Sequence, residues 1–351
     1  MRLKTQEILF SPEQRAIALL NPTAAAIWRA LDRGLSPPVV ASELAQRGAG
    51  VREAREFVDA ALAEWLQLGL VRPSVGPERG ALAQIVRLHD LRARIEYPDA
   101  KAAATADVLR HLEVDGDAAD VSFEFVEYRG CMHLFRNGEW LTLCAPDEVA
   151  PVLKGHLLTE VLERGSYELA LHTASLVRSG RMLLLCGSPG AGKSTLTQAL
   201  VHAGFGFAGD DVALLLMGGS AVGLPFAPAI KAGAWRLLAQ YLPGLASAPV
   251  FRRLDRRRVR YPVPETSLPC TPRPVGWVVL LDRRAGAQPR LTPVEPVEAL
   301  TGMLNGAFAV EEELTEAGFA ALVSIIASVP TLSLTYSGLA DAARLLSDTC
   351  P

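Results

Sequence analysis

The sequence has few cysteines and no long apolar run. Its five cysteines are odd in number, scattered and never spaced as CxxC, which excludes a disulfide framework or a zinc site and fits a reducing cytoplasm. The longest apolar runs, such as 212–217, are far shorter than the roughly 20 residues that cross a bilayer. The first residues are too polar for a signal peptide. We therefore expect a cytoplasmic protein with no membrane partner.

Lysine is also scarce, and the chain has little net charge. A net charge of −3 and a pI near 6.1 give no overall electrostatic reason to bind nucleic acid, so none is expected as a partner. Where arginine serves for most cations, a remaining lysine is a candidate for a position that needs a compact ammonium. The 35 basic residues include only five lysines, which are Lys4, Lys101, Lys154, Lys193 and Lys231.

Residues 1–72 predict a small unit with three helices and brief flanking strands. The pairs Asn21-Pro22 and Ser36-Pro37 each combine an N-cap with proline at the first helical position. A longer third helix stops at Gly69, and the Pro/Gly-bearing segment 72–80 indicates a domain boundary. At 351 residues the chain has room for two or three domains. The pattern predicts a winged-helix-like module followed by a larger domain.

The N-terminal pattern resembles the PqqD family of peptide-binding domains. The resemblance rests on LLNPTAAAIWRAL, VVASELAQRG and FVDAALAEWLQLGLV. PqqD relatives grip the leader segments of ribosomally made peptides, typically by pairing the leader with an edge strand. The resemblance therefore implies a precursor peptide as partner. A DNA-binding winged helix and a plain packing module remain as alternatives, although acidic residues on the second and third helices, such as Glu43 and Glu53, weigh against DNA.

The second half of the chain contains a phosphate-binding loop. An apolar run at 182–186 leads into GSPGAGKS, which matches GxxxxGKS/T and is followed by a helix that begins near Ser194. In such loops the backbone N–H groups converge on phosphate, the lysine reaches the β- and γ-phosphates and the serine holds Mg²⁺. We predict ATP and Mg²⁺ as ligands. The predicted nucleotide contacts are Gly187, Ser188, Pro189, Gly190, Ala191, Gly192, Lys193, Ser194 and Thr195.

Two adjacent carboxylates, Asp210 and Asp211, follow one helix after the loop. A phosphate loop, one helix and a strand that ends in Asp-Asp resemble HPr kinase/phosphorylase and its relatives. His172, in LHTASLVRSGRMLLLCGSPGAGKST, stands at the spacing of that family's histidine, and Lys231 lies in LPFAPAIKAG, where a smaller branch of relatives carries a lysine. The resemblance covers about residues 82–330. The glycine-rich second signature of true HPr kinases is not visible, so the resemblance does not imply HPr as the substrate.

The resemblance implies a serine kinase site. A serine hydroxyl is a poor nucleophile and needs a carboxylate that takes its proton. By resemblance Asp210 is the base and Asp211 joins Ser194 as a metal ligand, although these two roles are interchangeable on sequence alone. His172 would orient the base or the phosphate, and Lys231 would neutralise charge on the transferred group.

The structural alternatives stay open for several of these residues. The aspartate pair would otherwise begin a turn, His172 would be a structural histidine and Lys231 a surface lysine. Asp282, after the apolar run 278–281, is the other metal candidate that the sequence offers. The basic run 251–260 is either a solvated face or an arm that guides an acidic peptide, with contacts from Arg256, Arg257 and Arg258.

Together these features predict an α/β fold. A winged-helix-like α+β domain of PqqD type occupies residues 1–75. A P-loop kinase domain of the HPr kinase/PEP carboxykinase-like type occupies 76–351, with a strand-rich lobe at 82–165 and a nucleotide-binding core at 166–351. The predicted reaction is ATP-dependent phosphorylation of a serine in a leader-bound precursor peptide. A kinase of a small molecule such as free serine and a non-catalytic ATPase are the alternatives. HPr kinases are often hexamers, so the resemblance also admits a homo-oligomer.

Overall fold

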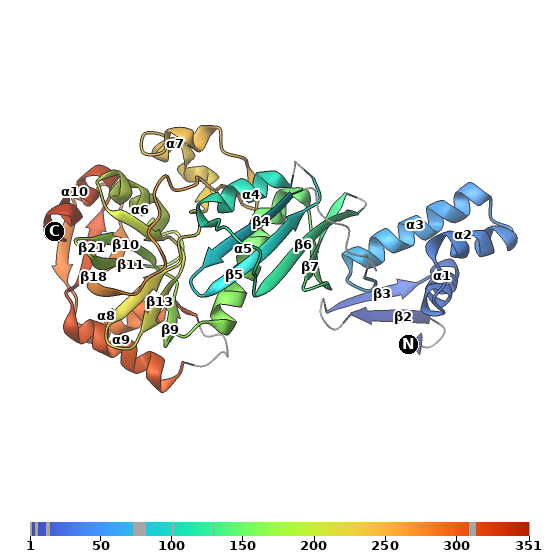
Figure 1. Ribbon diagram of the computed structural model, residues 1–351, viewed down its shortest axis with the longest axis horizontal. Coiled ribbons are helices and arrows are strands. Elements are labelled where there is room, and N and C mark those ends of the chain that lie inside the picture. The colour runs from blue at the N-terminus through green and yellow to red at the C-terminus, as the bar shows by residue number, and fades with distance from the viewer. Residues whose placement is uncertain are drawn as a thin grey trace. The chain divides into compact units, whose positions relative to one another are not determined.

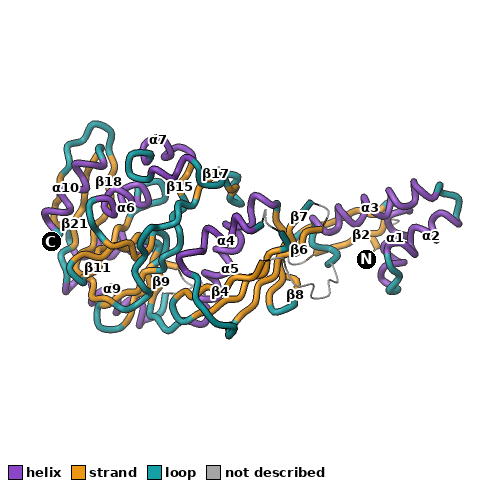
Figure 2. The backbone as a smooth tube through the Cα atoms, turned by 45° about the horizontal axis from the view of Figure 1, so that its top comes forward, coloured by secondary structure: helices purple, strands orange, loops and turns teal. Residues whose placement is uncertain are grey.

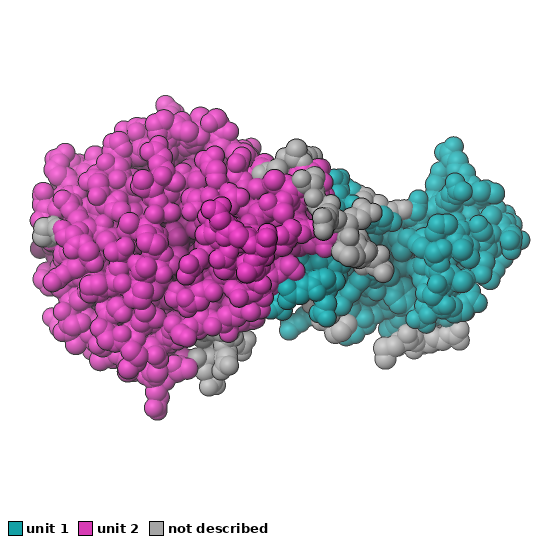
Figure 3. All heavy atoms as spheres, in the orientation of Figure 1, with its two compact units in different colours: residues 1–79, 126–143 teal, residues 80–125, 144–351 magenta. Residues whose placement is uncertain are grey.

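The computed structural model describes residues 2–3, 6–11, 15–72, 82–99, 102–128, 130–308 and 314–350. Its contacts divide the chain into two compact units, 1–79 with 126–143, and 80–125 with 144–351 (Figure 3). Residues 126–143, part of the predicted strand-rich lobe, thus group with the N-terminal residues. The predicted boundary at 75/76 and the linker beyond Arg72 lie outside the described residues. Within the described ranges, no helix is long and apolar enough to cross a membrane.

The N-terminal part of the first unit packs three helices on a small antiparallel sheet. The strand order is β1-β2-β3, which leaves β3 at an edge. The ring centres of Trp28 and Trp65 lie 5.2 Å apart in an edge-to-face arrangement, within the hydrophobic core of this part. As the sequence predicted, Asn21 caps the first helix by accepting a hydrogen bond from the Ala24 N–H at 2.8 Å. The elements are β1 (Arg2–Leu3), β2 (Gln6–Ser11), β3 (Ala16–Leu20), α1 (Pro22–Asp32), α2 (Pro37–Gln46) and α3 (Val51–Gln67).

Apart from Cys144, the first unit also contains the hairpin of β7 (Cys131–Arg136) and β8 (Glu139–Cys144). Asn137 and Gly138 turn the chain with φ of +51° and +81°, the positive values that a two-residue hairpin turn needs. The adjacent Asn and Gly are therefore the local sequence signal for this turn. Trp140 Nε1 donates to His133 Nδ1 at 3.2 Å across the hairpin.

The second unit begins with strands backed by helices. β5 pairs antiparallel with β4 and parallel with β6, and its residues alternate between buried and half-buried as expected for a sheet with one covered face. The helices α4 and α5 lie against β4 and β5 (Figure 2). The elements are β4 (Leu82–Leu88), β5 (Leu91–Tyr97), α4 (Ala103–Leu109), η1 (Arg110–Leu112), β6 (Val121–Tyr128), η2 (Pro146–Glu148) and α5 (Val149–Arg164). Residues 126–128 of β6 belong to the first unit.

A larger sheet forms the centre of the second unit. Within the described residues its order is β12-β10-β11-β18-β14-β13-β9-β20; β21 also pairs with β18, and β19 pairs with β21. Helices α6 and α10 cover one face and α8 and α9 cover the other (Figure 1). Because side chains alternate along a strand, Leu183 and Leu185 face α6 while Met182 and Leu184 face α9.

The strands of this sheet are β9 (Leu169–Leu171), β10 (Ala174–Arg178), β11 (Arg181–Cys186), β12 (Gly206–Gly209), β13 (Ala213–Leu216), β14 (Ser220–Gly223), β18 (Arg273–Arg283), β19 (Arg290–Pro293), β20 (Ala307–Phe308) and β21 (Thr331–Tyr336). Its helices are α6 (Lys193–His202), α8 (Pro296–Leu304), α9 (Glu316–Ser328) and α10 (Leu339–Thr349).

A small sheet of order β15-β17-β16 completes the second unit. Trp235 anchors it, because its Nε1 donates to the Ile230 carbonyl at 2.8 Å and the Arg260 guanidinium lies 4.3 Å from its ring centre. The elements here are β15 (Ile230–Lys231), η3 (Ala232–Ala234), α7 (Trp235–Leu238), η4 (Pro243–Ala246), β16 (Phe251–Arg252) and β17 (Arg258–Arg260).

Candidate active site

Strand direction brings the predicted site residues to one end of the central sheet. β10 runs antiparallel to both β11 and β12, with Ala174 opposite Leu185 and Ser175 opposite Gly209. The start of β10 therefore lies beside the ends of β11 and β12. The loop after β11, the histidine before β10 and the aspartates after β12 meet at this end.

The loop 187–195 joins β11 to α6. Gly190 and Gly192 have φ of +94° and +97°, values that side-chain-bearing residues rarely adopt. Tyr336, at the end of β21, donates to the Ala191 carbonyl at 3.1 Å and closes one side of the loop. A Cβ on Gly192 would lie 2.6 Å from the Tyr336 hydroxyl oxygen, whereas a Cβ on Gly190 would meet nothing within 4 Å. The loop thus has a fixed backbone that leads into the N-terminus of α6.

This difference between the two glycines gives a testable prediction. Gly190→Ala and Gly192→Ala should each cost about 1–2 kcal/mol of stability through backbone strain, measured by denaturant unfolding. Only Gly192→Ala should also displace Tyr336 from Ala191 and weaken binding of a fluorescent ATP analogue, by about tenfold or more. Equal nucleotide affinities for the two variants would contradict the proposed part of Tyr336 in shaping the loop.

Lys193 is folded back over the loop. Its side chain is buried, and Nζ donates to the Gly187 carbonyl at 2.6 Å. Burial lowers the pKa of Lys193, and the nearby Lys231 lowers it further, while the two aspartates act in the opposite direction. The ammonium therefore lies among groups of both signs at the end of the sheet.

Asp210 is the most unusual ionisable group of this site. Its side chain is 1% exposed, and neither carboxylate oxygen has a properly oriented hydrogen-bond partner in the described part of the chain. Burial, with the neighbouring charge of Asp211, raises the pKa of Asp210 to about 7. The hydroxyl of Ser194 and the ammonium groups of Lys154 and Lys193 lie near enough to limit that rise. A buried carboxylate with a pKa near neutrality is suited to accept and release a proton.

The pKa of Asp211 is shifted in the opposite direction, because Asp211 forms an ion pair with Lys154 of α5. Burial alone would raise the pKa of Asp211, but the Lys154 ammonium outweighs burial and the pKa lies below its ordinary value. The pairing likewise raises the pKa of Lys154 against the effect of burial. The Lys154 ammonium also lies 5.3 Å and 5.8 Å from the ring centres of Phe226 and Tyr261. The surroundings therefore raise the pKa of Asp210 and lower the pKa of Asp211.

His172 joins the aspartates through its ring. Nδ1 lies 2.9 Å from the backbone carbonyl oxygen of Asp211. A carbonyl can only accept, so Nδ1 carries the proton and Nε2 has the lone pair in the neutral ring. Burial lowers the pKa of His172, and the charge of Lys193 lowers it further. A neutral imidazole is therefore favoured beside the loop.

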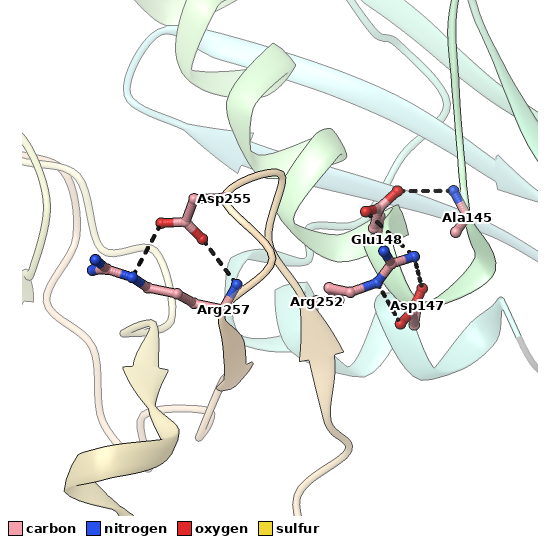
Figure 4. Close-up of polar contacts among 6 residues, drawn as sticks. All are labelled: Ala145, Asp147, Glu148, Arg252, Asp255 and Arg257. Atoms are coloured by element: carbon pink, nitrogen blue, oxygen red, sulfur yellow. Dashed lines mark hydrogen bonds and ion pairs between the residues drawn. The ribbon is translucent and has the colours of Figure 1, made fainter. Parts of the chain in front are cut away.

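The arginines of the basic run differ in what lies beside them. Arg257 forms an ion pair with Asp255, which also accepts from the Arg257 N–H at 3.1 Å (Figure 4). The Arg258 guanidinium lies 5.9 Å from the Trp235 ring centre, and Arg256 lies in the intervening turn with φ of +63°. The arginine of this run whose charge acts on the pKa of Asp211 is Arg253, which the sequence did not single out.

Arg252 has a structural part in this arrangement. Its guanidinium makes two hydrogen bonds to Asp147, at 3.0 Å and 3.1 Å, and an ion pair with Glu148 (Figure 4). Both acidic residues belong to η2, which directly precedes α5. The bonds therefore tie β16 to the beginning of the helix that carries Lys154.

Asp282, the other metal candidate, is already engaged. It accepts from the Thr335 hydroxyl at 3.2 Å and pairs with Arg284 at 2.8 Å. In the described ranges no three His, Cys, Asp or Glu side chains gather as a protein-only metal site. Mg²⁺ is usually held by one or two carboxylates together with phosphate oxygens and water. A carboxylate of the Asp210–Asp211 pair, beside Ser194 and the αL glycines of the loop, fits such a nucleotide-dependent metal.

Comparison with known proteins supports the N-terminal resemblance. Residues 7–71 match the family described as coenzyme PQQ synthesis protein D (PqqD), so the first unit contains a PqqD domain. The solved structure of the Hpr(Ser) kinase/phosphatase from Coxiella burnetii matches 52% of this chain and 95% of its own, with 13% identity and a TM-score of 0.23. That score is too low to carry an argument. A comparison with curated proteins found no match. The HPr-kinase resemblance and the assigned site roles therefore stay predictions.

Proposed function

We propose that this protein is an ATP-dependent kinase that phosphorylates a serine hydroxyl of a ribosomally synthesised precursor peptide. One observation carries the proposal. The loop 187–195 lies at the same end of the sheet as Asp210, whose pKa is raised, and Asp211, whose pKa is lowered. The PqqD domain at residues 7–71 supports a peptide bound through its leader.

The loop and the N-terminus of α6 would bind the phosphates of ATP, with Lys193 turning from the Gly187 carbonyl to the β- and γ-phosphates. Ser194 would hold Mg²⁺ together with Asp211. When bound, this metal neutralises charge on the phosphates. Lys231 and Arg253 would add positive charge on the acceptor side.

Asp210 would act as the general base. It accepts the proton of the serine hydroxyl as the serine oxygen bonds to the γ-phosphorus and ADP departs. Its pKa of about 7 lets the carboxylate be present at neutral pH and still hold a proton after transfer. His172, with Nδ1 bonded to the Asp211 carbonyl, would fix the backbone that carries both aspartates.

Intact-mass measurement of precursor peptides, incubated with the full chain, ATP and Mg²⁺, tests this proposal. A gain of one phosphate that weakens when the leader is removed supports it. Phosphorylation of free serine, with the peptides unchanged, would instead favour a small-molecule kinase.

The edge strand β3 provides a prediction about leader binding. Ile17 and Leu19 of β3 are 66% and 61% exposed, and Phe10, opposite Ile17 on β2, is 55% exposed. This outward apolar face lies beside an edge that no strand of the described residues pairs, and it suits pairing with an extended leader. Leu19→Lys should raise KM for the full precursor about tenfold and leave kcat unchanged, because uniform binding is lost.

The control for this experiment is Val39→Lys on α2, an equally drastic change at an exposed position away from the sheet. It should leave both constants unchanged. A leaderless peptide should not distinguish Leu19→Lys from the wild type. If Leu19→Lys altered kcat for that peptide, the leader would not explain the effect.

A further inference from the structure

The end of β18 borders the phosphate loop on the side opposite the aspartates. β18 runs parallel to β11, and its Leu280 pairs with Cys186, the last residue of β11 before the loop. In the order of the sheet, β11 lies between β10 and β18, whereas β12 lies beyond β10. The loop 187–195 therefore has the aspartates that follow β12 on one side and the residues that end β18 on the other.

Arg283, the last residue of β18, lies beside this loop. Because side chains alternate along a strand, Arg283 points to the same face as Leu281, which packs in the core beside α6. Its register partner on the parallel strand β21 is Tyr336, which belongs to the same core. A Cβ on Gly192 would lie 3.6 Å from Arg283 Cδ and 2.6 Å from the Tyr336 hydroxyl oxygen. The stem of Arg283 and the Tyr336 hydroxyl thus flank the same glycine of the loop.

The guanidinium of Arg283 has no counter-charge among the described residues. Arg283 is exposed, and its side chain makes no ion pair or hydrogen bond with any of them. The next residue, Arg284, pairs with Asp282 at 2.8 Å. The loop 187–195 contains Lys193 and no acidic residue. An uncompensated positive charge therefore borders a loop that already carries an ammonium, and a bound anion would offset their repulsion.

The surroundings favour phosphate over a nucleobase as the group that Arg283 meets. Tyr336 is completely buried, so its ring offers no surface on which a base could stack. The Arg283 guanidinium begins at the atom bonded to Cδ, and its planar set of donors matches the oxygens of phosphate. Phosphate held by the N–H groups of the loop would therefore lie within reach of this guanidinium.

We propose that Arg283 binds the phosphate chain of the nucleotide from the side of the loop opposite the aspartates. The inference rests on the proposed function for the identity of the ligand, ATP. It adds a nucleotide-binding residue that lies outside the motif 187–195. It also gives the two sides of the loop different tasks: the end of β18 holds the donor phosphates, and the end of β12 serves the metal and the acceptor.

Two methionine variants of the full chain test this inference. Arg283→Met removes the charge and keeps an unbranched stem beside Gly192, and Arg284→Met is the matched control at the next residue. ATP and inorganic tripolyphosphate, each with Mg²⁺, would be titrated calorimetrically. Arg283→Met should weaken binding of both probes by the same factor, about tenfold or more, and Arg284→Met by less than about twofold. Arg283→Lys should recover part of the loss, because it restores the charge without the planar donors.

Several results would overturn the inference. A loss of ATP affinity with tripolyphosphate affinity unchanged would assign Arg283 to the base or the ribose. Equal affinities for Arg283→Met and the wild type, an equal loss in Arg284→Met, or no binding of either probe to the wild type would also contradict it. A loss that comes with a lower urea midpoint, and that Arg283→Lys does not reduce, would give Arg283 a structural part only.

Phosphate transfer to a precursor peptide separates this inference from the proposed kinase. Arg283→Met should raise KM for ATP and, at saturating ATP, leave KM for the peptide at its wild-type value. Transfer whose KM for ATP is the same in Arg283→Met and the wild type removes the inference and keeps the kinase. Tripolyphosphate binding that depends on Arg283, without transfer to any peptide, keeps the inference and removes the kinase.

Discussion

Asp210→Asn is expected to abolish phosphoryl transfer and, at the same time, to stabilise the protein at pH 8. Transfer should fall by about 10²–10⁴-fold because asparagine cannot accept the serine proton. Stability should rise because the buried carboxylate has no properly oriented hydrogen-bond partner among the described residues, and its negative charge is unfavourable there. Asparagine has nearly the same shape and no charge.

The pH dependence of this gain follows from the raised pKa. Asp210 titrates at about 7 in the folded protein against 3.8 in the unfolded chain, so the folded state binds the proton more tightly. The shift is equivalent to a penalty of up to about 4 kcal/mol for the charged form above pH 7. The advantage of Asp210→Asn should therefore be complete above pH 7 and shrink as the pH falls towards 3.8. Urea unfolding at pH 8, 6 and 4.5 measures it.

Asp211→Asn is the matched control, since it changes the adjacent residue in the same way. It should destabilise the protein, because it leaves the Lys154 ammonium without its partner. In the wild type, kcat/KM should fall as the pH drops through about 7, where the base form of Asp210 is lost. If Asp210→Asn were less stable than the wild type at pH 8, Asp210 would not be a base whose buried negative charge is unfavourable.

Lys154→Met is expected to destabilise the protein by about 3 kcal/mol, the largest loss among the site lysines. It leaves the partly buried carboxylate of Asp211 uncompensated, and breaking such a pair costs far more than the pair contributes. The same change should raise the pKa of Asp211 towards that of Asp210, since the Lys154 ammonium is what lowers it. Guanidinium unfolding at neutral pH gives the stability directly.

The double variant Lys154→Met/Asp211→Asn should recover most of that loss, because no unpaired charge remains. Lys231→Met is the control at a half-buried lysine close to the same site and should cost less than about 1 kcal/mol. If the double variant were as unstable as Lys154→Met, packing of the lysine stem against Phe226 and Tyr261 would be the source of the stability instead.

The sequence predicted the parts of the site that depend on local order. The loop 187–195 and its helix follow from glycines and a lysine at fixed spacing, and the Asp210–Asp211 pair is only one helix away. Lys154 escaped prediction because it lies 57 residues before Asp211 and meets it only through the packing of α5. The scarcity of lysine was the available signal: Lys154, Lys193 and Lys231 all act on this site.

The fold shows the same contrast between local and distant features. The Asn21 cap and the Asn137-Gly138 turn were predictable because each depends on a few neighbouring residues. The grouping of residues 126–143 with the N-terminal residues was not predictable, because contacts between segments distant in the sequence produce no regular sequence pattern. A cavity of about 700 Å³ beside α6 is likewise assembled from segments far apart in the chain, and the sequence alone does not reveal it.

The fate of the γ-phosphate of ATP tests the kinase mechanism most directly. Full-length protein would be incubated with γ-labelled ATP, Mg²⁺ and a leader-bearing precursor peptide, beside Asp210→Asn, and the label followed into peptide and inorganic phosphate. The mechanism predicts label on a serine of the peptide with the wild type and almost none with the variant. Label that appeared only as inorganic phosphate, at the same rate in both proteins, would contradict it and indicate an ATPase without an acceptor.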